Sequence, residues 1–190
     1  MQLNISPGKK IGEVAFGKEK LILRAIKLKD AEGCIKFFNK IIKEGARVLL
    51  AERVDLEAEK RWVKSKVEAL KRKRALTLVL ENSNGEICGI FELRKRTMLK
   101  SKVDHVAEFA VSVDAKYRGK GLATKVAKIL FKLGKKFLKL KLIRSSYAER
   151  NIASAKLHKK LGFKITGRIP KGFKIGRKYE DEVLVVKELE

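Results

Sequence analysis

The sequence predicts a domain of the α/β (α+β) class with about seven strands and about four helices. Three observations lead to this prediction. A chain of 190 residues has the length of one domain, and its hydrophobic content of 45% is sufficient for a globular core. Short apolar stretches typical of strands are interspersed with longer stretches in which apolar residues recur at helical spacing.

The first third of the chain is expected to contain one strand and two helices. Residues 1–19 are weakly patterned and are expected to form an N-terminal extension or an extra hairpin, ahead of a single domain over residues 20–190. The apolar stretch 21–26 is expected to be the first strand. One helix is expected to begin after Asp30, a suitable N-cap, and another to cover residues 57–73, because apolar residues recur on one side of each.

The rest of the chain alternates between strand and helix patterns. Residues 76–80 and 86–93 have strand patterns on either side of a turn over residues 82–85, which predicts a hairpin. Residues 106–113 are almost continuously apolar, as expected for a strand in the middle of a sheet. The later expected elements are a helix over 121–137, a strand over 140–147, a helix over 152–161, and strands over 163–169 and 182–187.

A glycine-lined turn follows the apolar strand 106–113 and opens the next helix. Its sequence over residues 118–123 is Arg-Gly-Lys-Gly-Leu-Ala. Such a turn exposes backbone N–H groups at the positive end of a helix dipole, and it can bind phosphate without a particular side chain. The spacing of a dinucleotide fingerprint and that of a nucleotide-triphosphate loop are both absent. The turn is therefore predicted to bind phosphate in another way.

Two motifs resemble those of the GNAT superfamily of N-acetyltransferases. The Arg-x-x-Gly-x-Ala pattern of residues 118–123 looks like the family's acetyl-CoA pyrophosphate loop. Residues 151–163 are similar to its Asn-x-x-Ala-x-x-Leu-Tyr-x-x-x-Gly-Phe segment, with Ser154 replacing Ala and His158 replacing Tyr. Residues 179–183 resemble the last strand of many members. The resemblance covers roughly residues 21–189 and implies the GNAT fold, with a mixed, mostly antiparallel central sheet, and acetyl-CoA or coenzyme A as the cofactor.

The resemblance also implies which residues hold the cofactor. Asn151, which opens a helix, is expected to bond the pantetheine arm or to cap the helix, and both roles can coexist. The strand end is expected to lay its backbone against pantetheine, and the turn and the start of the helix to bind the pyrophosphate. These residues are Val111, Ser112 and Val113 for the strand, and Arg118, Gly119, Lys120, Gly121, Leu122, Ala123 and Thr124 for the turn and helix.

Glu108 is the candidate general base. It is the only acid in an apolar strand and shares a face with Ala110 by alternation. A carboxylate partly surrounded by apolar groups has a raised pKa, which suits a base, and the family often uses a glutamate in this strand, acting through water. Alternatively, Glu108 orients the substrate or pairs with a lysine. His105 is a rival base, although a surface position is the simpler interpretation for it.

His158 is the candidate general acid. The family's tyrosine at this position lies near the sulfur and can donate a proton to the leaving thiolate. An imidazole, whose unperturbed pKa is about 6.5, can also donate one. A helical histidine beside Lys159 and Lys160 can equally be a surface residue. Tyr147 or Tyr179 could supply the missing hydroxyl.

The net charge of +25 is concentrated in the C-terminal half. Residues 116–178 contain 21 Lys and Arg against one acid, Glu149, and so carry +20 of this charge. Coenzyme A needs only a few cations. The excess predicts non-specific contact with nucleic acid or the ribosome through this basic half, and the alternative is a solvated lysine surface. The Lys- and Glu-rich composition otherwise resembles that of heat-adapted proteins.

Two functional hypotheses follow. The first is an acetyl-CoA-dependent N-acetyltransferase that transfers acetyl directly to a primary amine, either of a small molecule such as an amino acid or of a protein. A polyamine is a less favoured acceptor, because so basic a protein repels cations. The alternative is a basic nucleic-acid- or ribosome-associated binding module with a vestigial acetyl-CoA pocket. No metal spacing, secretory signal or membrane-spanning stretch is present, so a cytoplasmic protein without a metal is expected, of undetermined oligomeric state.

Overall fold

An eight-stranded sheet in the order β1-β2-β3-β4-β5-β6-β8-β7 forms the centre of the protein. The computed structural model describes residues 3–44, 55–97 and 99–189. The strands are β1 (Lys10–Phe16), β2 (Glu19–Ala25), β3 (Ala75–Glu81), β4 (Ile87–Lys95), β5 (Val106–Val113), β6 (Leu142–Ala148), β7 (Lys164–Ile175) and β8 (Lys178–Glu188). Neighbouring strands are antiparallel except for β5 and β6. The predicted α/β (α+β) class with a mixed, mostly antiparallel sheet is confirmed.

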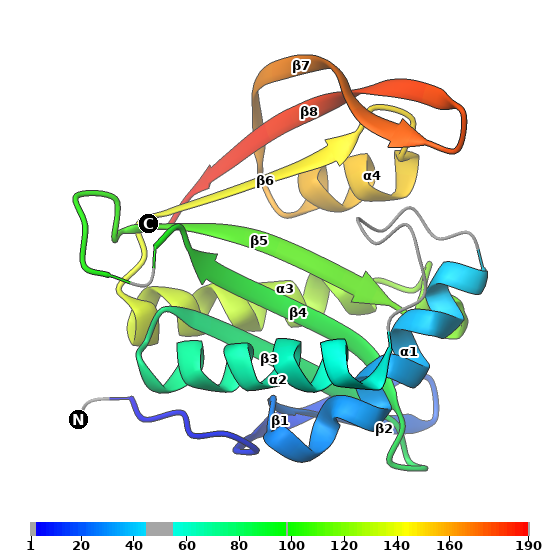
Figure 1. The fold of residues 1–190 in the computed structure, drawn as a ribbon, viewed down its shortest axis with the longest axis vertical. Coiled ribbons are helices and arrows are strands. Elements are labelled where there is room, and N and C mark those ends of the chain that lie inside the picture. The colour runs from blue at the N-terminus through cyan, green and yellow to red at the C-terminus, as the bar shows by residue number, and fades with distance from the viewer. Residues whose placement is uncertain (1–2, 45–54, 98, 190) are drawn as a thin grey trace.

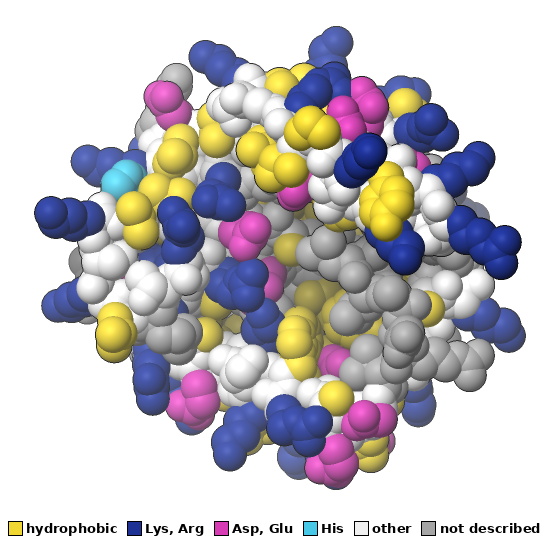
Figure 2. All heavy atoms as spheres, turned by 45° about the horizontal axis from the view of Figure 1, so that its top comes forward, with side chains coloured by type: hydrophobic (Ala, Val, Ile, Leu, Met, Phe, Trp, Pro, Cys, Tyr) yellow, Lys and Arg dark blue, Asp and Glu magenta, His cyan; other side chains and the backbone are white. Residues whose placement is uncertain are grey.

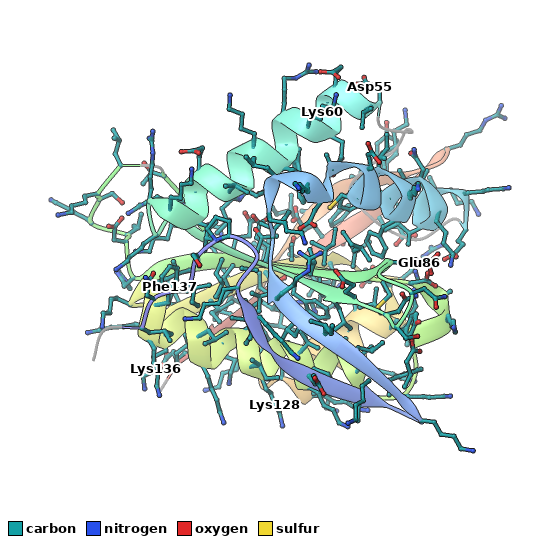
Figure 3. The ribbon with its side chains drawn as sticks, turned by 90° about the horizontal axis from the view of Figure 1, so that it is seen from below. Asp55, Lys60, Glu86, Lys128, Lys136 and Phe137 are labelled. Carbon is teal, nitrogen blue, oxygen red and sulfur yellow. The ribbon has the colours of Figure 1, made fainter. Side chains whose placement is uncertain are left out.

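In the described part of the chain, four α-helices cover the two faces of this sheet. They are α1 (Ala31–Lys43), α2 (Leu56–Lys71), α3 (Leu122–Leu133) and α4 (Ile152–Lys160), and a π-helical turn, η3 (Gly134–Leu138), continues α3. Helices α1 and α2 lie on one face and α3 on the other, whereas α4 lies beside β6, β8 and β7 (Figures 1 and 3). Among the described residues, none of the helices is long and apolar enough to cross a membrane.

The sheet separates two hydrophobic cores. The larger core includes α3, whose fully buried Leu122, Val126 and Leu130 pack with side chains of the central strands. Gly134 follows α3 at a point of close approach, where an added Cβ would come within 2.5 Å of Leu93 Cδ1 on β4. The smaller core lies between the sheet and the other two long helices, and it includes Cys34, Phe37, Phe38, Ile41, Val63 and Val67. The apolar stripes predicted from helical spacing therefore face the sheet.

Glu59 of α2 is a buried carboxylate. It is 2% exposed, and its Oε1 atom has no hydrogen-bond partner among the described residues. Burial raises the pKa of Glu59 to about 7 from its usual 4.5. The folded protein therefore keeps this proton up to about pH 7, whereas the unfolded chain loses it near pH 4.5. Because the folded state binds more protons between these values, stability falls as the pH rises through this window.

Replacing Glu59 with glutamine is expected to remove this loss of stability. The free energy of unfolding should rise by about 3 kcal/mol or slightly more at pH 8 and change little at pH 4.5, because the pKa difference is about 2.5 units and each unit corresponds to about 1.4 kcal/mol. Urea denaturation at both pH values measures the difference. Glu57→Gln is the matched control, since the Glu57 side chain is 69% exposed on the same helix. An equal gain in both variants would contradict the prediction.

Candidate active site

An opening forms where β5 and β6 part. The two strands pair only through Val106↔Leu142, Ala107↔Ile143 and Glu108↔Arg144. Beyond this point β5 stays paired with β4 as far as Val113, while β6 stays paired with β8 as far as Ala148, so the two strands diverge (Figure 1). A sheet that splits in this way leaves the inner edge of β5 free to pair with another extended molecule.

The peptide groups of Val111 and Val113 face this opening. The Asp114 amide donates to the Cys88 carbonyl on β4 at 3.0 Å. Because successive residues of a strand direct their peptide groups to alternate sides, Ser112 also faces β4, and the two valines face the space left by β6. The Val113 carbonyl accepts a hydrogen bond from Arg118 Nε at 2.7 Å. The Val111 peptide group thus lies in the opening between β5 and β6.

The turn before α3 presents backbone amides. Gly119 and Gly121 have φ angles of +82° and +79°, which glycine adopts without strain, and Gly121 is the N-cap of α3 without a side-chain cap. The first helical hydrogen bond runs from the Lys125 amide to the Gly121 carbonyl at 3.1 Å, so the amides of residues 122–124 precede the helical ladder. Among the described residues, no atom lies within 4 Å of a Cβ added at either glycine. The turn can therefore admit a phosphate group.

The side chains of this turn differ in their availability. Arg118 is 43% exposed at its side chain, and its Nη2 lies 3.6 Å from Oε2 of Glu44, the C-cap residue of α1. Lys120 lies over the Phe16 ring, with Nζ 5.2 Å from the ring centroid. Leu122 is 2% exposed and belongs to the core, so it can offer only its amide. Ala123 and Thr124 are half-buried.

His158 lies inside the protein. It is 4% exposed, and its ring lies 5.3 Å from that of Tyr147 and 4.9 Å from that of Phe163 between centroids. The alternative that placed His158 on the surface is therefore wrong. Burial lowers the pKa of His158, against an opposing hydrogen bond to the Ser154 carbonyl, so the neutral imidazole is favoured.

A chain of hydrogen bonds connects His158 to the point where β5 and β6 part. Its Nδ1 lies 2.8 Å from the Ser154 carbonyl oxygen, which can only accept, so Nδ1 carries a proton. Nε2 lies 2.9 Å from Ser145 Oγ on β6, and this oxygen lies 2.9 Å from the Phe109 carbonyl oxygen on β5. Ser145 and Phe109 directly follow the last residue pair between the two strands.

The hydrogen bonds from His158 through Ser145 to Phe109 can be made either with a neutral or with a protonated imidazole ring. With a neutral ring, Nε2 accepts from the Ser145 hydroxyl, and the Phe109 carbonyl loses its donor. With a protonated ring, Nε2–H donates to Ser145, whose hydroxyl then donates to Phe109. The arrangement can therefore take up or release a proton beside the opening. Sequence reasoning did not identify Ser145.

The other candidates near α4 are placed as follows. Asn151 is the N-cap of α4, and its Oδ1 accepts from the Ser154 amide at 3.1 Å. Tyr147 stacks on the His158 ring at an interplanar angle of 25°. Tyr179 is 58% exposed near the start of β8. Of the two tyrosines, Tyr147 is thus the one that contacts the hydrogen-bonded chain.

Glu108 lies at the last residue pair between β5 and β6. Its Oε2 accepts a hydrogen bond from Arg94 Nη2 on β4 at 3.0 Å, and its side chain is 45% exposed. The expected apolar surroundings are therefore not present, and the partner is an arginine rather than a lysine. His105 is exposed and precedes β5, at the end of the strand away from the phosphate-binding turn.

A second carboxylate, missed by sequence reasoning, lies on the same face of the sheet. Glu92 of β4 pairs in register with Ala110, two residues beyond Glu108. Its Oε1 lies 2.7 Å from Nζ of Lys66 on α2 and accepts from Thr77 Oγ1 at 3.2 Å. Figure 2 shows a depression near the middle of the molecule, with acidic and basic side chains around it. This face thus offers two carboxylates beside the opening.

The two cysteines do not offer a nucleophile. Cys34 and Cys88 are buried free thiols. Burial raises the pKa of both thiols, that of Cys88 to about 12. Because the thiolate is the nucleophilic form, a covalent acetyl-cysteine is disfavoured at either position.

Comparison with protein families agrees with the split sheet and the glycine turn. The family model described as Acetyltransferase (GNAT) domain matches residues 20–164. The chain belongs to the GNAT acetyltransferase family. The GNAT fold expected from residues 118–123 and 151–163 is therefore confirmed, and the match includes the opening, the phosphate-binding turn and α4.

Individual relatives of this GNAT protein include enzymes with different acceptors. It is 30% identical over 103 residues to the spermidine N(1)-acetyltransferase of Escherichia coli strain K12, which covers 53% of this chain and 52% of that protein. The chain thus spans about half the length of the curated relatives it matches. A ribosomal-protein-S5-alanine acetyltransferase from Vibrio fischeri superposes with a TM-score of 0.79 at 25% identity, covering 93% of this chain and 96% of that one.

A further solved structure has the same fold. The spermidine N-acetyltransferase from Vibrio cholerae, in complex with CoA and spermine, superposes with a TM-score of 0.73 at 18% identity, covering 88% of this chain and 95% of that one.

Proposed function

We propose that this protein is an acetyl-CoA-dependent N-acetyltransferase that transfers acetyl directly to a primary amine. The observation that carries the proposal is the divergence of β5 from β6 immediately before a glycine-lined helix start. The first feature suits an extended amide-bearing chain, and the second suits a pyrophosphate. Coenzyme A combines both, and membership of the GNAT family supports its use here.

The residues that would hold the cofactor follow from this arrangement. The Val111 peptide group would pair with the pantetheine amides, and Asn151 would contribute from the opposite side of the opening while capping α4. The amides of residues 119–124 would bind the pyrophosphate, helped by the α3 dipole. When bound, acetyl-CoA supplies the acetyl group as a thioester.

Two groups of this protein would accept and donate the protons that acetyl transfer requires. A protonated amine is no nucleophile, and Glu108, half exposed at the start of the opening, would accept its proton through water. The leaving thiolate needs a proton. In the form with a protonated ring, the Ser145 hydroxyl would give its proton to the thiolate and take the Nε2 proton of His158 in its place, so that the ring returns to its favoured neutral form. The buried thiols of Cys34 and Cys88 support direct transfer without an acetyl-cysteine intermediate.

The charge of the protein supports a protein amine as the acceptor. Its net charge of +25 repels polyamines, whereas it attracts a protein substrate that sits on an RNA-rich particle. Figure 2 shows Lys and Arg side chains along most of the rim of this face, with fewer Asp and Glu side chains among them. The ribosomal-protein acetyltransferase from V. fischeri supports this choice, and the E. coli spermidine enzyme supports the polyamine instead. Such an acceptor would place the protein in the cytoplasm.

The basic half of the protein is expected to bind duplex DNA or RNA non-specifically. Lys125, Lys128, Lys132 and Lys136 are exposed along α3 and η3. Figure 3 shows Lys128 and Lys136 pointing away from the sheet. On duplex DNA, the logarithm of the affinity should fall linearly with the logarithm of the salt concentration, with a slope near −0.9 for each phosphate neutralised. Retention on a duplex-DNA column at several salt concentrations measures this slope. Absence of retention at about 50 mM salt would leave a solvated lysine surface as the interpretation.

A thiol-release assay tests the proposed function. The protein is mixed with acetyl-CoA and, separately, with free amino acids, spermidine, and peptides with free N-terminal amines or free lysine amines. Release of free thiol with the peptides and not with spermidine is the expected result. Release with spermidine alone would overturn the choice of acceptor. The absence of release with every amine would favour the alternative, a binding module with a vestigial pocket.

A further inference from the structure

A second cationic site lies at the other end of α3 from the phosphate-binding turn. It is a hollow of about 430 Å³, and the residues that line it include Lys73, Lys95, Lys102, Lys139 and Phe137. In Figure 3, Phe137 lies at the end of the molecule where η3 stops. Residues 122–138 are helical, and a rise of 1.5 Å per residue separates the two ends by roughly 25 Å. The hollow is therefore separate from the candidate active site.

One wall of the hollow is held in place by Arg74. This residue is 6% exposed, and its guanidinium contacts both carboxylate oxygens of Asp104, at 2.7 and 2.9 Å. It also donates to the carbonyl oxygens of Thr97 and Leu99. The Arg74 guanidinium holds the pKa of Asp104 well below its usual range. The negative charge of Asp104 is therefore already compensated by Arg74.

Within the part of the chain that the structure describes, the four lysines around the hollow form no ion pair, and Asp104 attracts Lys95 only from a longer distance. None of them is within ion-pair distance of a described carboxylate. Lys73 Nζ lies 5.7 Å from the centroid of the Phe137 ring. Lys95 is half-buried, and burial lowers its pKa. An anion in the hollow would relieve the mutual repulsion of these ammonium groups and the desolvation of Lys95.

Two of these lysines occupy backbone positions that favour glycine. Lys73 and Lys139 have φ angles of +53° and +59°, and they stand at the C-terminal ends of α2 and η3. Helices commonly end with glycine in this left-handed conformation, because a side chain there is strained. Both positions nevertheless carry a lysine, and both line the same hollow. Strain of this kind is concentrated at functional sites.

We propose that this hollow binds a polyphosphate group, two or three linked phosphates carried by a nucleotide or present as inorganic polyphosphate. Lysine ammonium groups bind phosphate as point charges, and four of them match the charge of such a group. The volume lies within the range of about 300–1,000 Å³ that is usual for small-ligand sites. The site is independent of the proposed acetyl transfer.

Calorimetry with tripolyphosphate tests the proposal. The titration is made at about 150 mM salt on the full-length Gly121→Val protein, in which the amides of the phosphate-binding turn are expected to lose their alignment. Coenzyme A is left out, because it carries two linked phosphates and would itself compete for the hollow. One tripolyphosphate should bind per chain. Lys73→Gly and Lys139→Gly should each weaken binding at least about tenfold, since each removes a full charge from the hollow. Neither variant should lower Tm, because glycine adopts a positive φ without strain.

Lys171→Gly is the matched control. Lys171 has a φ angle of +55° and lies on β7, away from the hollow, so this variant removes the same charge and the same strain. Its affinity for tripolyphosphate should change less than about twofold by the same charge argument. An equal loss in Lys171→Gly would show general attraction to a basic surface and overturn the proposal. A fall in Tm in the two hollow variants, with unchanged binding, would assign the lysines to stabilising the helix ends and overturn it as well.

Comparison of ligands distinguishes the two sources of the polyphosphate. Tighter binding of ATP than of tripolyphosphate would support a nucleotide, and equal binding would support inorganic polyphosphate. Binding of duplex RNA without measurable binding of tripolyphosphate would overturn the proposal in favour of a nucleic-acid surface.

Discussion

Replacing Glu108 with glutamine is expected to lower kcat/KM by about 10²–10⁴ at neutral pH, because the amine then lacks its proton acceptor. Acetyl-CoA binding should remain nearly intact, since the carboxylate lies at the start of the opening rather than along Val111 or the turn. Steady-state kinetics with a peptide amine and calorimetry with coenzyme A measure the two quantities.

The ion pair with Arg94 provides the control for this variant. Both side chains are about half exposed, and such a pair contributes about 0–1 kcal/mol to stability. If Glu108 serves only this pair, Arg94→Gln should impair the enzyme as much as Glu108→Gln does. Full activity of Glu108→Gln between pH 6 and 9 would remove Glu108 from the mechanism. Glu92, on the same face beside Ala110, would then be the next carboxylate to replace.

The sequence predicts the central elements well, because their patterns arise from burial in the sheet. Strand β5 spans Val106–Val113, the same residues as predicted, and its apolar pattern follows from the burial of Val106, Ala107, Phe109 and Val113. The predicted hairpin appears as β3 and β4. Of the two capping residues predicted, Asn151 accepts an amide hydrogen bond at the start of α4, whereas Asp30 precedes α1 without a side-chain cap bond. The cap of α2, Asp55, was not predicted, and it accepts from the Ala58 amide.

The edges of the sheet are less predictable. Strand β7 extends from Lys164 to Ile175, six residues beyond the predicted end at 169. Pro170 and Gly172 interrupt the strand pattern there, and the register shifts between Ile169 and Phe173. Proline is tolerated because β7 is the edge strand of the sheet. Strand β1 lies at the opposite edge of the sheet and buries only Val14, so its sequence lacks a strong apolar pattern.

The polar part of the candidate site could not be assembled from the sequence. His158 on α4 is connected to Ser145 on β6 and, through it, to Phe109 on β5, and the sequence does not show that these three elements meet. One sequence feature could have indicated the contact. Ser145 lies two residues after the fully buried Ile143, on the same face of β6, and a buried polar side chain needs a hydrogen-bond partner. Lys66 gives a similar signal, since it interrupts the apolar side of α2 next to Val63 and Val67.

Replacing Gly121 with valine is expected to weaken acetyl-CoA binding by at least about 10², the equivalent of losing one or two hydrogen bonds to a charged phosphate group. Gly121 has a φ angle of +79°, which a β-branched residue can hardly adopt, so the amides that would bind the pyrophosphate move or lose their alignment. The valine side chain also projects into the open space beside the turn, where an added Cβ meets no protein atom. Calorimetry with coenzyme A measures the loss.

Gly85→Val separates this effect from strain alone. Gly85 lies in the turn between β3 and β4, has a φ angle of +77°, and likewise has no atom within 4 Å of an added Cβ. Both variants should therefore lose similar stability, since both force valine into the same backbone conformation. Only Gly121→Val should lose affinity for coenzyme A. Unchanged affinity in Gly121→Val, or an equal loss in Gly85→Val, would refute the placement of the pyrophosphate at the start of α3.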